Sequence, residues 1–259
     1  MLHRPDGDAI IVVTQPAHAW VSGQLARAWG NERFGSFEPY EQVCLAAEQH
    51  DLAWAEWELT PTLNPRTGRP HAFTELPVAE HTALLARGPA LVGAQSRYAG
   101  LLTALHAVSL YEMRSYTTGD PDARTAREFL EGQRAWAERE ACALAAIPAY
   151  TRPATPPAPA RNQRLLRCWD RLSLLLCHGL EGEIRVAAVP AAGEEAVDLV
   201  LTPARQATIV EPWPFRDHRV ELAWEGRRLE GRYRDEQVMR DALAGAPPTL
   251  MRLALVRDA

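Results

Sequence analysis

The sequence carries four side chains of metal-binding types in the order His, His-Asp, Asp. They are His18, the adjacent pair His50 and Asp51, and Asp170. Imidazole nitrogens and carboxylate oxygens together suit Mn, Fe, Mg or Zn, and the coordination geometry decides among these ions. A metal held by such ligands polarises a substrate oxygen and activates a water molecule.

Helical spacing turns these side chains toward an apolar interior. His18 shares a helix face with Val21, three residues further on. Asp170 lies between Leu166 and Leu174, each four residues away on the same face. A carboxylate inside a leucine stripe is costly unless it is paired or bound to a metal. We therefore interpret His18 and Asp170 as inward-facing candidate ligands.

His106 is a fifth candidate, because it shares a helix face with Leu102 and Ser109. Taken singly, a core histidine is more often a hydrogen-bonded structural residue. Asp170 is equally compatible with a structural ion pair to a neighbour such as Arg167. The pattern gains specificity only in combination, since each member lies on a separate inward helix face.

The composition limits the chemistry available to the chain. None of the 259 residues is lysine, so all 28 cationic residues are arginine. Schiff-base, pyridoxal-phosphate, P-loop and kinase mechanisms all need a lysine amine and are excluded. The net charge of −5 does not suggest a general nucleic-acid binder. The motifs HExxH, GxSxG and GxGxxG are absent, which argues against zincins, nucleophile-elbow hydrolases and dinucleotide-binding folds.

Cysteine usage and hydropathy indicate a cytoplasmic protein. The four cysteines, at 44, 142, 168 and 177, lie in apolar helix-like stretches without a CxxC pair. We expect them to be small, reduced core residues. The first residues do not resemble a signal peptide, and no stretch reaches the roughly 20 apolar residues of a membrane span. We expect no membrane association.

Apolar periodicity predicts a mainly helical chain up to about residue 180. The predicted helices are residues 16–30, 39–50, 78–87, 96–115, 121–147 and 162–179. A short strand is expected at 8–14 and a long loop at 51–77. The proline-rich segment 150–161 is expected to be a connector.

After Gly182 the pattern changes to short strand-like runs, with a predicted hairpin turn at Glu225-Gly226. The expected fold is α+β, mostly α. We expect a helical domain with a short N-terminal strand at 1–180. An antiparallel β subdomain at 181–259 is expected to pack on its helices.

At His18, His50-Asp51 and Asp170 the chain resembles the HD-domain metal-dependent phosphohydrolases. That superfamily has a helical bundle and the ligand order His, His-Asp, Asp. The resemblance implies that His18, the doublet His50-Asp51 and Asp170 hold one divalent metal. It also implies that His106 faces the substrate or holds a second metal. The implied fold is an HD-like helical bundle with a C-terminal antiparallel β region.

A second resemblance covers almost the whole chain. The segments TQPAHAWVSGQLARAWG, AAEQHDLAWAEWE, LNPRTGRPHAF, LLTALHAVSLY and CWDRLSLLLCHG are similar to a bacterial family known as domain of unknown function 3891. Members of that family typically carry a second acid and a Gly-Trp after the His-Asp doublet, where this chain has Leu52 and Ala53. The family implies no activity, so the enzymatic hypothesis depends on the HD-like ligand pattern.

The leading hypothesis is a metal-dependent phosphohydrolase that acts on a small phosphorylated molecule or a nucleotide. His106 and Asp51 are its candidate catalytic residues. The two alternatives are a non-catalytic HD-like module for ligand binding or protein interaction, and a di-iron oxygenase on the same scaffold. The number of bound metal ions, and whether His106 binds one, separates the hydrolase from the oxygenase.

Four further side chains are candidate substrate contacts. Arg69, Arg97 and Arg114 are expected to meet a phosphate. Trp54 is expected to wall the pocket or to stack on a base. Each also has an ordinary interpretation, as an exposed arginine or as a tryptophan of the core.

Overall fold

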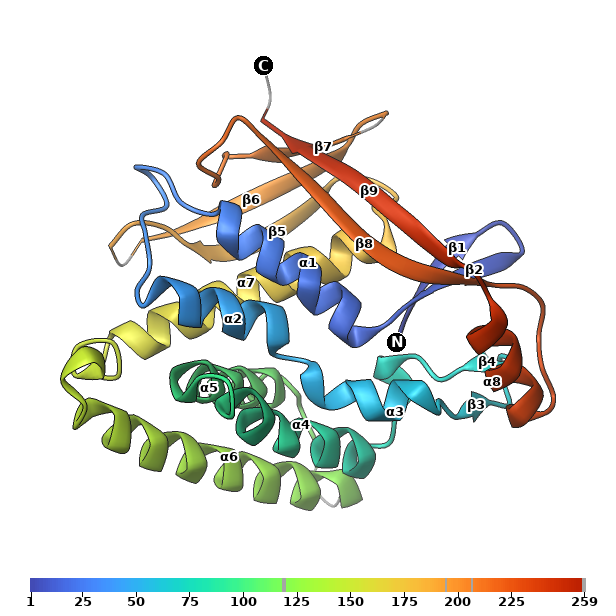
Figure 1. Ribbon diagram of the computed structural model, residues 1–259, viewed down its shortest axis with the longest axis horizontal. Coiled ribbons are helices and arrows are strands. Elements are labelled where there is room, and N and C mark those ends of the chain that lie inside the picture. Colours follow the sequence, from blue (N-terminus) through green and yellow to red (C-terminus); the bar gives the residue numbers. More distant parts are fainter. Residues whose placement is uncertain (118–119, 194, 206, 258–259) are drawn as a thin grey trace.

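The computed structural model describes residues 1–117, 120–193, 195–205 and 207–257 (Figure 1). The helices are α1 (Gln15–Ala28), α2 (Tyr40–Gln49), α3 (Ala55–Leu59), α4 (Val78–Gly93), α5 (Arg97–Glu112), α6 (Pro121–Ala145), α7 (Ala158–His178) and α8 (Glu236–Gly245). The strands are β1 (Leu2–Asp6), β2 (Ala9–Val13), β3 (Leu63–Asn64), β4 (Arg69–Pro70), β5 (Ile184–Pro190), β6 (Ala196–Pro203), β7 (Ala207–Glu211), β8 (Arg219–Leu229) and β9 (Pro248–Val256). Among these helices, none combines the length and the apolar character that crossing a lipid bilayer requires.

A large curled sheet dominates the molecule, and it overturns the expected helical bundle with a small C-terminal antiparallel region. The sheet has seven strands in the order β1-β2-β8-β9-β7-β6-β5 and forms a half-barrel over the helices (Figure 1). It is mixed, because β7 and β9 run parallel while the other neighbours are antiparallel. The predicted strand at 8–14 is therefore one of two N-terminal strands in a sheet completed by the far end of the chain. The division of the chain at residue 180 remains a prediction.

Strand β2 shows why the N-terminal strands were hard to place. Its Ile11 and Val13 face the main core, while Ile10 and Val12 face a second cluster with Leu243 of α8. A strand buried on both faces has no alternating pattern and reads as a plain apolar run. One of its two partner strands is the neighbouring β1, but the other lies far away in the sequence, because Ile10 is paired with Leu229 of β8.

The predicted hairpin turn at Glu225-Gly226 is wrong. Strand β8 runs straight through both residues, and Gly226 pairs with Thr249 of β9. A Cβ atom at position 226 would lie 2.5 Å from the Cγ2 atom of Ile11. Gly226 therefore serves the close approach of β2 to β8, which is the other common use of a glycine within a strand.

The helices form layers beneath the sheet. Helices α1 and α7 lie against its concave side, α2 and α5 lie behind them, and α4 and α6 are farther out (Figure 1). The long loop expected at 51–77 contains α3 and the small β3–β4 ladder. The prediction of four core cysteines holds for three of them, since Cys142 is exposed.

An aromatic cluster fixes the position of α1 against α7. The indole of Trp29, which ends α1, packs edge-on against Phe34, Trp169 and Phe215, with ring centroids 5.4–5.9 Å apart. Trp29 lies three turns after His18 on the same face of α1, and Trp169 immediately precedes Asp170. Truncating such a buried aromatic typically costs about 3–5 kcal/mol. The cluster therefore holds the two helices in the arrangement that brings His18 to Asp170.

Candidate functional site

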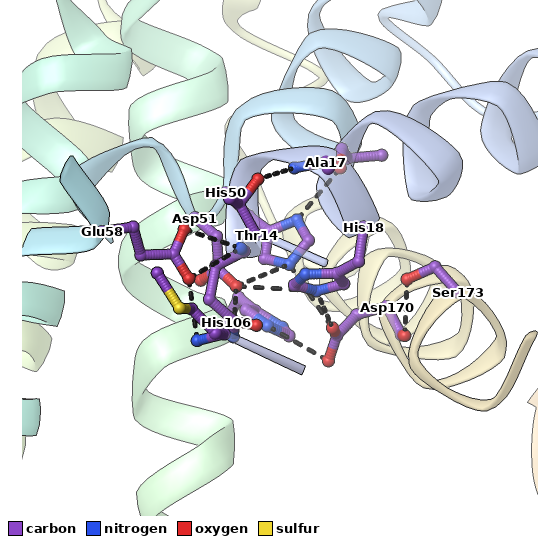
Figure 2. Close-up of polar contacts among 12 residues, drawn as sticks. Thr14, Ala17, His18, His50, Asp51, Glu58, His106, Asp170 and Ser173 are labelled. Atoms are coloured by element: carbon purple, nitrogen blue, oxygen red, sulfur yellow. Dashed lines mark hydrogen bonds and ion pairs between the residues drawn. The ribbon is translucent and has the colours of Figure 1, made fainter. Parts of the chain in front are cut away.

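Five buried titratable side chains meet where α1, α2, α5 and α7 converge (Figure 2). We call them the His/Asp cluster: His18, His50, Asp51, His106 and Asp170. Each is less than a tenth exposed, and His18 is completely buried.

His18 is positioned by the start of α1. The side chain of Thr14 caps the helix by accepting a hydrogen bond from the backbone N–H of Ala17. One turn later, the Nε2 atom of His18 lies 3.2 Å from Oδ1 of Asp170 and 3.5 Å from Oδ2 of Asp51. The ring therefore faces two carboxylates from two different parts of the chain.

His50 follows the last residue of α2 and is oriented by its own backbone. Its Nδ1 atom lies 3.0 Å from the carbonyl oxygen of Ala47. Because a carbonyl only accepts, Nδ1 must carry the proton, and Nε2 is turned toward the cluster. Nε2 is 3.4 Å from Oδ1 of Asp170, but it has no well-aligned hydrogen-bond partner among the described residues. Metal-binding histidines typically donate their other ring N–H to an acceptor such as a backbone carbonyl, which fixes the orientation of the ring.

Asp51 and His106 complete the cluster. The Oδ2 atom of Asp51 accepts a hydrogen bond from the side-chain amide of Gln15 at 3.2 Å. His106 projects from α5, and its Nε2 atom lies 3.6 Å from Oδ2 of Asp170. Asp170 thus faces His18, His50 and His106 together (Figure 2).

The spacing of these atoms suits a bound cation. Two ligand atoms at about 2.1 Å from one ion lie about 3.0–3.4 Å apart in octahedral or tetrahedral geometry. The nitrogen–oxygen distances within the cluster are 3.2–3.7 Å. Two groups of three residues each bring their ligand atoms within 4.8 Å of one another: His18, His50 and Asp51, and His50, His106 and Asp170. The cluster could therefore hold a metal ion.

The electrostatics of the cluster divide the two carboxyl groups. Burial raises the pKa of Asp51. Burial acts in the same direction on Asp170, but the hydrogen bond with His18 and the nearby imidazole of His50 outweigh it and hold the pKa of Asp170 well below its ordinary value. Asp170 is therefore the permanent anion of the site.

The pKa values of two histidines, His50 and His106, are also shifted in opposite directions. Burial alone would lower the pKa of His50, but the facing carboxylates Asp51 and Asp170 raise it to about 9. Burial lowers the pKa of His106 to about 3, since Asp170 only partly offsets it. The cluster thus holds a proton on His50 where a metal ion would otherwise bind, and metal binding would release that proton.

A second layer of polar residues, which the sequence analysis did not identify, supports Asp51. Glu58 of α3 is buried and accepts the backbone N–H of Gln15 at 2.8 Å. Its other oxygen lies 2.7 Å from the amino group of Met1. Gln15 in turn donates to Asp51. These contacts follow from packing between distant segments, so no periodicity in the sequence marks them.

The four predicted substrate contacts lie outside the cluster, and their roles remain predictions. Arg69 donates to the carbonyl of Asp8, Arg97 pairs with Glu140, and Arg114 lies over the ring of Tyr111. Trp54 is buried and packs edge-on against Trp57 and His81.

Comparison with known proteins yields one match. A family model described as a protein of unknown function (DUF3891) matches residues 1–231. The matched range contains the whole His/Asp cluster but ends before α8 and β9. No curated protein and no solved structure matches the chain.

Proposed function

Because the chain belongs to the DUF3891 family, whose function is unknown, we propose its function from the cluster itself: it is a metal-dependent phosphohydrolase. The substrate is a small phosphorylated molecule or a nucleotide. The observation that carries this proposal is the gathering of three imidazoles and two carboxylates in one buried cluster, as two overlapping groups of three. Such a convergence is costly without a ligand, because buried charges need paired or coordinated partners.

His18, His50, Asp51 and Asp170 would hold one divalent ion. When bound, that ion polarises a phosphoryl oxygen and lowers the pKa of bound water to about 7. The ligand set favours Mn, Fe or Zn over Mg, since imidazole nitrogens suit the former and Mg prefers oxygen. The Nε2 atom of His50 is buried and has no aligned hydrogen-bond partner among the described residues, which is the clearest sign that a ligand belongs there.

His106 would act on the leaving oxygen of the substrate. Burial keeps this imidazole neutral, because it lowers the pKa to about 3. A neutral ring donates a hydrogen bond from one nitrogen and does not supply a full positive charge. We therefore assign His106 to stabilising the leaving oxygen, and Asp51 to orienting the attacking water.

The substrate would approach along α7. Arg171 and Leu174, which follow Asp170 on this helix, line a cavity of about 640 Å³. Met1, whose amino group binds Glu58, lines the same cavity. Arg171 is exposed and supplies a guanidinium for the phosphate.

A di-iron oxygenase is the second candidate. The group His50, His106 and Asp170 is a second set of possible ligands, and it shares His50 with the group His18, His50 and Asp51. Metal stoichiometry separates the two functions: hydrolysis with the first ligand set needs one ion per chain, whereas the oxygenase needs two irons.

The test is elemental analysis combined with a phosphatase panel. Protein produced with added Mn, Fe or Zn should contain one ion per chain and should hydrolyse p-nitrophenyl phosphate or a nucleotide. Asp170→Asn, which keeps the side-chain shape, should lose both the metal and the activity. His218→Ala, which removes an exposed imidazole, is the matched control and should lose neither. Wild-type protein without stoichiometric metal would contradict the proposal.

A further inference from the structure

A second cavity lies at one end of the half-barrel, away from the His/Asp cluster. Helix α7 packs against both edge strands, β1 and β5, and so spans the open side of the curled sheet. At the C-terminal end of α7 a cavity of about 480 Å³ remains. We call it the mouth. Its lining includes Arg4, Leu180, Arg205, Met251, Arg252 and Leu253. Ligand sites are common at such openings of curled and closed sheets.

Three arginines line the mouth, namely Arg4, Arg205 and Arg252. They come from β1, from the turn before β7 and from β9. No acidic residue is among the lining residues of this cavity. Elsewhere on the same sheet arginines are paired with carboxylates, as Arg185 is with Asp198 and Arg228 is with Asp6. Within the described ranges, the three arginines of the mouth have no such ion pair.

Arg4 is held in place by the end of α7. Its Nη1 atom donates to the carbonyl oxygens of Leu176 and Cys177, at 3.3 and 3.4 Å. Gly179 has a φ of +96°, and a Cβ atom there would lie 3.2 Å from the Cζ atom of Arg4. The glycine thus ends the helix and leaves room for the guanidinium. Because a guanidinium has five N–H donors, those on Nε and Nη2 remain available to a ligand.

The rest of the wall is apolar. Trp224 is 3% exposed, so its indole lies behind the wall and supports it. Met251, Leu253 and Leu180 line the same space. The hydroxyl-bearing Thr208 is also buried and faces the cavity from β7. The mouth therefore combines cationic residues with an apolar wall.

We propose that the mouth binds a small anion that joins a phosphate or carboxylate group to a flat apolar body. The guanidinium groups of Arg4, Arg205 and Arg252 meet the oxyanion, since guanidinium matches these planar or branched oxygens with paired hydrogen bonds. The apolar body lies against Leu180, Met251 and Leu253. This site uses none of the residues of the His/Asp cluster, so it stands whether or not the cluster binds metal.

Isothermal titration calorimetry with phenylphosphonate and with benzoate tests the proposal. Phenylphosphonate cannot be hydrolysed as a phosphate ester, so turnover at the cluster does not interfere. The wild-type protein should bind at least one of the two saturably, and the tighter one identifies the oxyanion. The double variant Arg205→Gln/Arg252→Gln should weaken this binding at least about tenfold, because each loss removes a charge-assisted hydrogen bond. Both arginines are exposed, so the variant should fold normally.

Two controls make the result decisive. Arg127→Gln/Arg139→Gln changes two exposed arginines of α6 and alters the net charge by the same amount; it should bind as wild type does. Asp170→Asn should also retain binding, which separates the mouth from the His/Asp cluster. Equal weakening in the α6 control, loss of binding in Asp170→Asn, or no saturable binding of either probe would overturn the proposal.

Discussion

Two buried histidine sites in this protein differ in how their hydrogen bonds are completed. His81 of α4 is buried, its Nδ1 atom lies 2.7 Å from the hydroxyl of Tyr111, and its ring packs on Trp54. In the His/Asp cluster, by contrast, the Nε2 atom of His50 has no aligned partner in the described part of the chain. A buried histidine nitrogen that has a protein partner, as Nδ1 of His81 does, calls for no ligand, while several histidines around an incompletely bonded centre point to a ligand.

The two sites also differ in the charge of their histidines, His81 and His50. Burial, aided by the charge of Arg114, lowers the pKa of His81 to about 4, so this ring is neutral. His50 is equally buried, but two carboxylates reverse the effect and raise its pKa to about 9. Burial alone therefore does not identify a functional histidine; the charge of its neighbours does.

The largest expected effect is the loss of metal from the cluster. Asp170 faces three histidines, so Asp170→Asn removes the charge that every one of them shares. We expect metal affinity to fall by more than about 100-fold, beyond the range for residues that only support ligands. Elemental analysis of purified protein measures it. His81→Gln should keep its metal; if it lost the metal as Asp170→Asn does, the two sites would not be distinct.

The next effect is on acid stability and concerns His81. Its pKa is about 4 in the folded protein and about 6.5 when unfolded, so the unfolded chain binds more protons between these values. The stabilisation is complete above about pH 6.5 and is lost as the pH falls toward 4, by roughly 3 kcal/mol at most. Urea denaturation at pH 7 and pH 4.5 should show a smaller loss in His81→Gln than in wild type. Identical losses would show that His81 does not titrate as proposed.

A smaller effect is expected for Tyr111→Phe. The change removes the hydroxyl that meets His81 and leaves a buried ring nitrogen without that partner. We expect the free energy of unfolding to fall by about 1–3 kcal/mol. Urea denaturation checks the change, and elemental analysis should find the metal content unchanged. A Tyr111→Phe variant as stable as wild type would mean that His81 is satisfied by other means.

The smallest effect is expected at Gln15, which donates to Asp51 from outside the cluster. Gln15→Met keeps the length of the side chain and removes the donor. Metal affinity should fall about tenfold, at the low end for a residue that orients a ligand. Competition with a chromogenic chelator gives the value. An unchanged affinity would show that Asp51 is oriented by its backbone position alone.

Helical periodicity was the part of the sequence that could be interpreted reliably. It placed His18, His106 and Asp170 on inward faces, and the structure brings these residues together with His50 and Asp51. The same pattern applies to His81, which has Leu85 one turn further on, so periodicity cannot tell the two kinds of histidine apart.

The sheet could not be predicted in the same way, because its pairing is not local. β2 pairs with β8, and the sequence of neither strand indicates which strand it pairs with. Gly226 was misleading for a related reason: a glycine that admits the side chain of Ile11 looks in the sequence like a glycine that makes a turn. Glu58 was missed because its partners, Gln15 and Met1, come from other segments.

The pairing of β2 with β8 also sets the order in which the protein can be completed during synthesis. His18, His50 and His106 leave the ribosome before Asp170, and β8 follows later still. Contacts this far apart in sequence form slowly, because a long loop must close first. A nascent chain therefore exposes the apolar strand β2 and an incomplete His/Asp cluster for much of its synthesis. Exposed apolar strand surface makes that interval prone to aggregation.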